Sequence, residues 1–193
     1  LFLLLIFKHS VMGAGKTAQI IGNTTSRDII LKPEVDTRAE KNEILSRNGM
    51  SKPCIPIPEG TTKDEMREVL ERSLEKTEGK VSVYIDEAQF LSKQQVDGVL
   101  EFSCLNPNVN IYCYGLLTDF SSLLFEGSKR LVEVADRIET IEQMDRETGE
   151  IATQNMRKSG SDSVVVIGKE DIYEPVCKTR FFMGGEKHDG RQN

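Results

Sequence analysis

The sequence predicts an α/β protein in which a mostly parallel sheet is flanked by helices and carries a phosphate-binding P-loop. The first observation is an apolar run at residues 1–7 that stops at a glycine-containing turn, which ends in the Gly-Lys-Thr tripeptide at 15–17. The second is an apolar strand over 81–85 that ends in the acidic pair at 86–87. The third is the alternation of predicted strands and helices along the remaining chain.

The turn at the end of the apolar run has the composition of a loop that binds nucleotide phosphates. Gly13 and Gly15 let the backbone approach the phosphates closely. Lys16 can reach the β and γ phosphates, and the Thr17 hydroxyl is a candidate ligand of Mg²⁺. The alternative interpretation is a glycine turn with an exposed lysine.

The acidic pair Asp86-Glu87 closes an apolar strand, where two carboxylates are unfavourable unless cations or protons accompany them. In a P-loop protein this strand end holds Mg²⁺ and points a carboxylate at the nucleophile. The alternative interpretation is a pair of residues that caps a helix. A short strand at 29–31 precedes Arg38, which is either a phosphate ligand or a solvated surface arginine.

The remaining elements are predicted from their apolar patterns and turn residues. We expect a loop-rich segment over 39–60, and a helix from Thr62, with a capping box to Glu65, to about Lys76. Later segments are predicted as a helix at 94–102, a strand at 109–114, a mixed apolar and charged segment at 131–141, a hairpin tip at 145–150, a polar loop at 158–163, a strand at 164–167 and a disordered end from 187.

Composition narrows the function classes. The chain has 25 basic and 31 acidic residues and a formal charge of -6, which argues against broad binding to nucleic acids or anionic membranes. The apolar run at 1–7 is too short to span a membrane, so we expect a soluble protein. Four cysteines without a C-x-x-C pair fit a reducing cytosol.

Five motifs, in this order and spacing, resemble the type II thymidine kinase family, and the resemblance runs from about Phe2 to Phe182. The serine at position 10, where the common P-loop pattern has glycine, agrees with bacterial and phage-like members of that family. The motifs are the P-loop, residues 32–38, the strand end at 86–90, the segment at 114–120 and residues 165–177.

The resemblance implies a P-loop (RecA-like) kinase core that transfers the γ-phosphoryl of ATP to the 5′-hydroxyl of thymidine, giving dTMP and ADP. Glu87 would be the general base, and Thr17 and Asp86 would hold Mg²⁺. The residues expected to bind ATP are Ser10, Val11, Met12, Gly13, Ala14, Gly15, Lys16, Thr17, Arg38, Asp86, Glu87 and Gln89.

In this family a C-terminal "lasso" loop closes over the nucleoside and reads thymine largely through main-chain atoms. The lasso would comprise about residues 153–176 of this chain. The residues expected to contact thymidine are Met12, Phe90, Leu116, Phe120, Phe125, Val166 and Tyr173. The resemblance further implies a cytoplasmic homotetramer of nucleoside salvage, with dTTP as a candidate feedback inhibitor.

The chain departs from the family at its structural zinc site. Residues 142–144 replace the first pair of ligands, and of the second pair only Cys177 remains, with Arg180 in the fourth position. We therefore expect no bound zinc. The expected organisation is a kinase core at 1–140, a lasso and degenerate zinc-ribbon subdomain at 141–182, and a flexible tail at 183–193.

A second departure is a segment between Lys16 and Arg38 that is several residues shorter than the family leads us to expect, which predicts a truncated first helix. These departures motivate two alternatives to the kinase. One is a nucleotide-binding homologue with lost or reduced activity. The other is a different P-loop ATPase or kinase, which would not account for the lasso residues.

Overall fold

The computed structural model describes residues 5–36, 40–157 and 172–185. Within these ranges, six strands form one parallel sheet in the order β5-β2-β6-β7-β1-β8. The predicted α/β fold is confirmed. The strands are β1 (Leu5–Ser10), β2 (Ile29–Pro33), β5 (Ile55–Ile57), β6 (Ser82–Ile85), β7 (Asn110–Leu116) and β8 (Arg137–Thr140).

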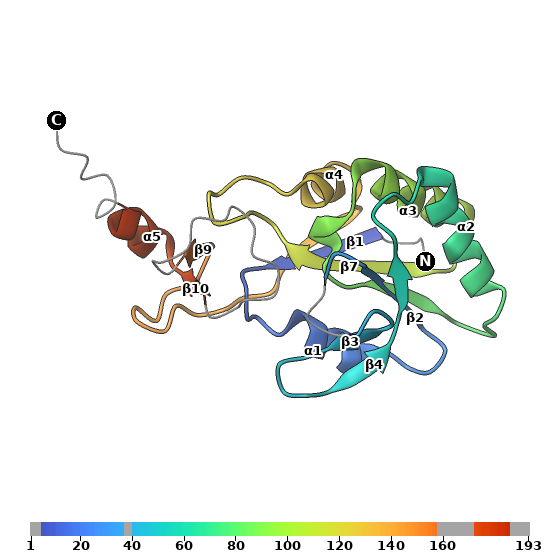
Figure 1. The fold of residues 1–193 in the computed structure, drawn as a ribbon, viewed down its shortest axis with the longest axis horizontal. Coiled ribbons are helices and arrows are strands. Elements are labelled where there is room, and N and C mark those ends of the chain that lie inside the picture. Colours follow the sequence, from blue (N-terminus) through green and yellow to red (C-terminus); the bar gives the residue numbers. More distant parts are fainter. Residues whose placement is uncertain (1–4, 37–39, 158–171, 186–193) are drawn as a thin grey trace.

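Helices cover both faces of the sheet unequally (Figure 1). One face packs against α2 (Lys63–Leu74), α3 (Lys93–Leu105) and α4 (Glu126–Val134), and the other against α1 (Lys16–Asn23) and the hairpin of β3 (Glu43–Leu45) and β4 (Ser51–Pro53). Successive strand residues point to opposite faces, so β6 sends Val83 and Ile85 into the larger core and Tyr84 into the smaller one. Since α1 has only eight residues, the second face receives little helical cover.

The capping box predicted at the start of α2 is confirmed. The Thr62 side chain accepts from the Glu65 amide at 3.3 Å, and the Thr62 amide donates to the Glu65 carboxylate at 2.8 Å. Ser92 and Gln95 form a second capping box at the start of α3. Each box satisfies two amides that the helix leaves without intrahelical partners.

Two segments differ from the sequence-based expectation. The segment 39–60 contains β3, β4 and β5, each only three residues long, which is too short for an alternating apolar pattern to show. Pro56 is tolerated in β5 because this strand lies at the sheet edge. The sequence pattern predicts no helix at 126–134, because Gly127 and Ser128 in the first turn of α4 have the composition of a loop.

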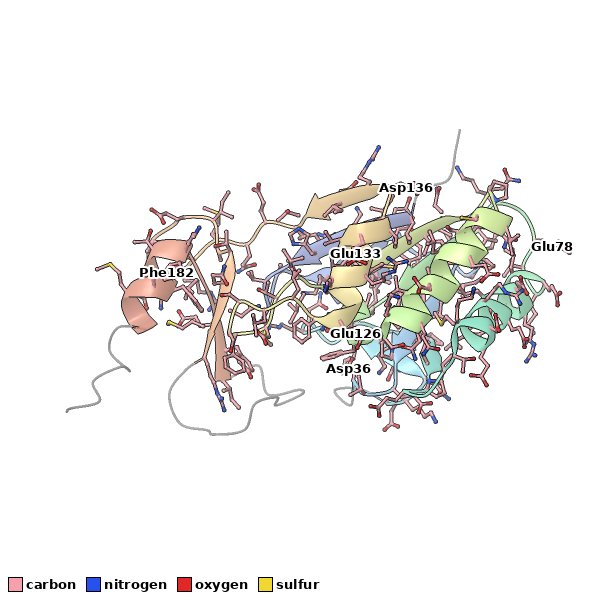
Figure 2. All side chains as sticks on the ribbon, turned by 90° about the horizontal axis from the view of Figure 1, so that it is seen from above. Asp36, Glu78, Glu126, Glu133, Asp136 and Phe182 are labelled. Atoms are coloured by element: carbon pink, nitrogen blue, oxygen red, sulfur yellow. The ribbon has the colours of Figure 1, made fainter. Side chains whose placement is uncertain are left out.

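The C-terminal part lies beyond the end of the sheet (Figure 1). It contains the antiparallel pair β9 (Gln154–Arg157) and β10 (Tyr173–Val176), followed by α5 (Lys178–Gly185). The predicted hairpin tip at 145–150 is confirmed, because Met144 and Ile151 form an antiparallel bridge around it. On α5, which Figure 2 shows at the far end of the molecule from α2, Phe182 is 63% exposed.

Three expectations concern residues outside the described ranges: the polar loop at 158–163, the strand at 164–167 and the tail from 187. Among the described residues, no helix has both the length and the apolar character needed to span a membrane.

Candidate active site

The predicted P-loop connects the carboxyl end of β1 to the first residue of α1. Gly13 and Gly15 have φ angles of 80° and 77°, a left-handed conformation that glycine adopts without steric cost. Lys16 is 7% exposed, and its ammonium group donates to the Ser10 hydroxyl at 2.9 Å and to the Val11 carbonyl at 3.3 Å. The lysine therefore folds back over the loop, with its charge in the concavity where phosphates bind in P-loop proteins.

The acidic pair lies beside this loop because β1 and β6 are both neighbours of β7 in the parallel sheet. The Thr17 hydroxyl donates to Asp86 Oδ2 at 2.7 Å, which joins the start of α1 to the end of β6. Asp86 is 1% exposed and Glu87 is 6% exposed. A threonine hydroxyl and a buried carboxylate in contact are hard oxygen donors of the kind that Mg²⁺ prefers.

Glu87 has a φ angle of 50°, in the left-handed region that is rare for residues other than glycine. Backbone strain of this kind is concentrated at functional sites. The conformation turns the chain from β6 into the short 3₁₀ helix η1 (Ala88–Phe90). The chain therefore leaves the extended conformation of the strand at Glu87, one residue after Asp86, whose amide still donates to the Leu31 carbonyl of β2 at 2.9 Å.

Gln89 links the acidic pair to the neighbouring strand. Its side-chain amide donates to the Glu87 carboxylate, and its carbonyl oxygen accepts from the Leu116 amide at 3.1 Å. Gln89 is 2% exposed, so both bonds are shielded from water. A Cβ atom on Gly115 would lie 2.8 Å from the Gln89 Oε1 atom. Only glycine at position 115 therefore leaves room for this side chain.

The six predicted thymidine-wall residues within the described ranges are half-buried, which leaves part of each available to a ligand. Phe90 and Phe125 are in edge-to-face contact, with centroids 5.8 Å apart. Phe120 and Tyr173 are 6.0 Å apart, and this second pair joins the segment after β7 to β10. Both separations lie in the range of attractive aromatic pairs. The six are Met12, Phe90, Leu116, Phe120, Phe125 and Tyr173.

Two contacts between the C-terminal part and the P-loop side of the molecule were not predicted. The Met12 amide donates to Asn155 Oδ1 at 2.8 Å, and Asn155 is 4% exposed. The guanidinium of Arg157 lies 5.4 Å from the centroid of the Phe120 ring. Both residues lie on β9, and Asn155 is 143 positions from Met12 in the sequence. No local pattern in the sequence indicates pairing over such a separation.

Arg180, which stands at one of the expected zinc-ligand positions, is the centre of an ion-pair cluster. Its guanidinium contacts Asp145 at 2.8 Å, Glu147 at 2.7 Å and Glu174 at 2.7 Å. Asp145 also accepts from the Cys177 amide at 2.8 Å. A guanidinium has only donors and cannot ligate a metal ion, so this arrangement does not fit zinc. Among the described residues, no three His, Cys, Asp or Glu side chains are grouped to hold a metal.

The hydrogen bonds also change the acidity of Asp145. Burial alone would raise its pKa, but hydrogen bonds from the amides of Cys177 and Glu147 and from the Arg180 guanidinium hold the pKa well below its usual range. The carboxylate therefore stays ionised at neutral pH. Near the P-loop, burial and the charge of Lys16 lower the pKa of His9.

Two predicted site residues, Arg38 and Val166, lie outside the described ranges. The structure thus brings together the P-loop, the acidic pair and Gln89, and it places four of the six wall residues in two aromatic pairs, Phe90 with Phe125 and Phe120 with Tyr173.

Comparison with known proteins agrees with this geometry. The family model described as thymidine kinase matches residues 3–181. The chain is 33% identical to a thymidine kinase of Lactobacillus acidophilus and 31% identical to one of Streptococcus pyogenes, in each case over 92% of this chain and 96% of the relative. It is 39% identical to a thymidine kinase of Encephalitozoon cuniculi, over 68% of this chain and 61% of that protein.

Proposed function

The chain belongs to the thymidine kinase family, and we propose that it transfers the γ-phosphoryl group of ATP to the 5′-hydroxyl of thymidine. The observation that carries this proposal is the 2.7 Å hydrogen bond between the Thr17 hydroxyl and Asp86. It joins the phosphate-binding loop to the strand end that bears the acids. Phosphoryl transfer needs the phosphate-binding loop and the acidic residues around one γ-phosphate.

In this proposal the P-loop amides and Lys16 bind the polyphosphate, and Lys16 exchanges its present bonds to Ser10 and Val11 for phosphate oxygens. Thr17 and Asp86 would hold Mg²⁺, which when bound neutralises charge on the transferring phosphoryl group. Since the transition state is loose, positioning of the reactants contributes much of the rate enhancement.

Glu87 is proposed as the general base that accepts the proton of the 5′-hydroxyl. Gln89 holds the Glu87 side chain by a hydrogen bond, so the carboxylate is oriented before the substrate binds. Because both residues are nearly excluded from water, a hydroxyl group delivered by the nucleoside would meet an acceptor with few competing water molecules.

The thymine base is proposed to lie among the wall residues, with the lasso at 153–176 closing over it. In this organisation residues 1–140 form the kinase core and residues 141–182 the lasso subdomain. Apolar walls discriminate one methyl group by only about 1–3 kcal/mol. Discrimination against cytosine therefore depends on hydrogen bonds, where an unsatisfied buried group costs about 1–3 kcal/mol.

The family resemblance also leads us to propose a homotetramer that acts in the cytoplasm and is inhibited by dTTP. The four thiols, all free, suit a reducing compartment. Light scattering of the purified protein, with and without dTTP, tests the oligomer. A dTTP titration of the initial rate tests inhibition.

The reaction is tested by following dTMP formation from thymidine and magnesium–ATP with the purified chain and with Glu87→Gln. Loss of a general base is expected to lower kcat about 100-fold or more, while binding of ATP and thymidine is retained. Glu78→Gln is the matched control, because Glu78 is exposed in the turn before β6. Full activity of Glu87→Gln would refute the assigned base, and absence of dTMP with the unsubstituted chain would refute the proposed function.

A further inference from the structure

The β3–β4 hairpin is fixed against α1, the helix that follows the P-loop (Figure 1). From β3, Ile44 is 1% exposed and packs in the same core cluster as Ile20 and Ile21 of α1. From β4, the Lys52 ammonium donates to the Thr24 carbonyl at 2.5 Å and to the Thr24 hydroxyl at 2.7 Å. Since Thr24 is the C-cap of α1, this cation satisfies the carbonyl end of the helix.

The turn of this hairpin is held by its own hydrogen bonds. The Ser46 amide donates to the Met50 carbonyl at 2.8 Å, and the Gly49 amide donates to the Ser46 carbonyl at 3.0 Å. The Ser46 hydroxyl adds a bond of 2.9 Å to the Met50 carbonyl. Gly49 has a φ angle of 82°, which closes the turn. The turn therefore presents its second residue, Arg47, from an ordered backbone.

The Arg47 guanidinium lies directly against the P-loop. A Cβ atom built on Gly13 would be 2.9 Å from Arg47 Nη1 and 3.3 Å from both Cζ and Nη2. Arg47 and Gly13 are far apart in the sequence, and only the packing of the hairpin on α1 brings them together. A side chain at position 13 would occupy the space that the guanidinium fills.

We propose that Arg47 binds the polyphosphate of the nucleotide held by the P-loop and is a further substrate-contacting cation of the kinase. This inference rests on the proposed function and adds a residue to its ATP site. The described groups around the loop include the cation of Lys16 and the two carboxylates of Asp86 and Glu87. A polyphosphate brings several more negative charges, so a second cation at the loop improves the charge balance.

The chemistry of the group suits this role. A guanidinium is planar, remains charged at all accessible pH values, and can donate two parallel hydrogen bonds to one phosphate group. Arg47 is exposed, so a modest rotation of its side chain can move its head group from the Gly13 backbone onto a phosphate without unpacking the hairpin. Its loss should therefore weaken phosphate binding and leave the thymidine site unchanged.

The test compares Arg47→Gln and Arg47→Lys with the unsubstituted chain. Affinity for magnesium–ATP is measured by calorimetry, and inhibition by magnesium–tripolyphosphate is measured in the kinase assay. We expect Arg47→Gln to weaken both about 10- to 100-fold, as for loss of a charge-assisted hydrogen bond. Arg47→Lys should recover part of the loss, and the KM for thymidine at saturating ATP should not change.

Arg72→Gln is the matched control, because Arg72 is an exposed arginine on α2 that pairs with Glu68. It removes the same charge and should leave ATP affinity unchanged. A purely structural role for Arg47 predicts that its loss raises the KM for thymidine as much as that for ATP, and this result would overturn the inference. Unchanged binding of ATP and tripolyphosphate by Arg47→Gln would also overturn it. Failure of the unsubstituted chain to bind ATP would instead refute the proposed function itself, and the inference with it.

Discussion

Gly127 sets how closely α4 approaches the segment that carries the acidic pair. A Cβ atom at this position would lie 2.5 Å from the Ala88 carbonyl oxygen, 2.6 Å from that of Leu91 and 3.0 Å from that of Gln89. Carbon and oxygen atoms in close contact are usually about 3.3 Å apart or more, so Gly127→Ala forces α4 and η1 apart by about 1 Å. These oxygens belong to the backbone and cannot rotate away.

The magnitude follows from two opposing terms. Overpacking of this kind costs about 1–3 kcal/mol. Alanine stabilises a helix relative to glycine by up to about 1 kcal/mol. Gly22 in α1 separates the two terms, because nothing lies within 4 Å of its hypothetical Cβ atom. Gly22→Ala should therefore gain the helical term alone, and Gly127→Ala should be less stable than Gly22→Ala by about 1–3 kcal/mol.

The assay is urea unfolding of the two variants followed by circular dichroism, together with the kinetics of thymidine phosphorylation. If the same variants are unfolded by heat, a difference of 1 kcal/mol in stability corresponds to about 2–4 °C in Tm for a chain of this size. Because η1 also carries Gln89, Gly127→Ala should lower kcat, whereas Gly22→Ala should not. Equal stability of the two alanine variants, or a full kcat in Gly127→Ala, would show that the close approach is not a constraint.

Two further predictions concern the C-terminal cluster and the cysteines. Arg180→Met should lower the free energy of unfolding at pH 7, while Lys178→Met, an exposed cation on the same helix, should not. The folded state lowers the pKa of Asp145, so the stability that this carboxylate contributes is complete above the unfolded pKa of about 3.9. The loss of unfolding free energy in Arg180→Met should therefore shrink as the pH falls below that value. A deficit unchanged down to pH 2 would contradict this account. Burial raises the pKa of Cys113 to about 12, whereas Cys104 is exposed. Iodoacetamide at pH 8 should therefore label Cys104 and not Cys113 in the folded protein. Mass spectrometry of the labelled peptides checks this prediction, and equal labelling of the two cysteines would refute it.

The sequence predicts which residues of the candidate site lie close together where these residues follow a strand directly. The P-loop comes immediately after β1 and the acidic pair immediately after β6, and parallel strands in one sheet bring such ends to the same edge. Their proximity therefore follows once the fold class is known. The hydrogen bond between Thr17 and Asp86 is the direct result.

The residues that the sequence does not reveal depend on contacts between distant segments. Arg47 lies in a turn between strands of only three residues, and it meets Gly13 because of how that hairpin packs on α1. The sequence predicts the loss of a zinc ligand at position 180, where Arg180 stands, yet it does not indicate that Arg180 pairs with three carboxylates. Such pairings are set by packing and have no periodic signature.

The segment 86–90 shows why its neighbours are as constrained as the acids themselves. β7 approaches it from one side, where Gly115 leaves space for the Gln89 side chain, and α4 approaches from another, where Gly127 contacts the backbone carbonyls. Gln89 in turn orients Glu87. Any side chain added at either glycine displaces this segment, so both glycines constrain the position of the proposed base although neither can contact a substrate through a side chain. Position 115 and position 127 are therefore requirements of the active site as much as of the fold.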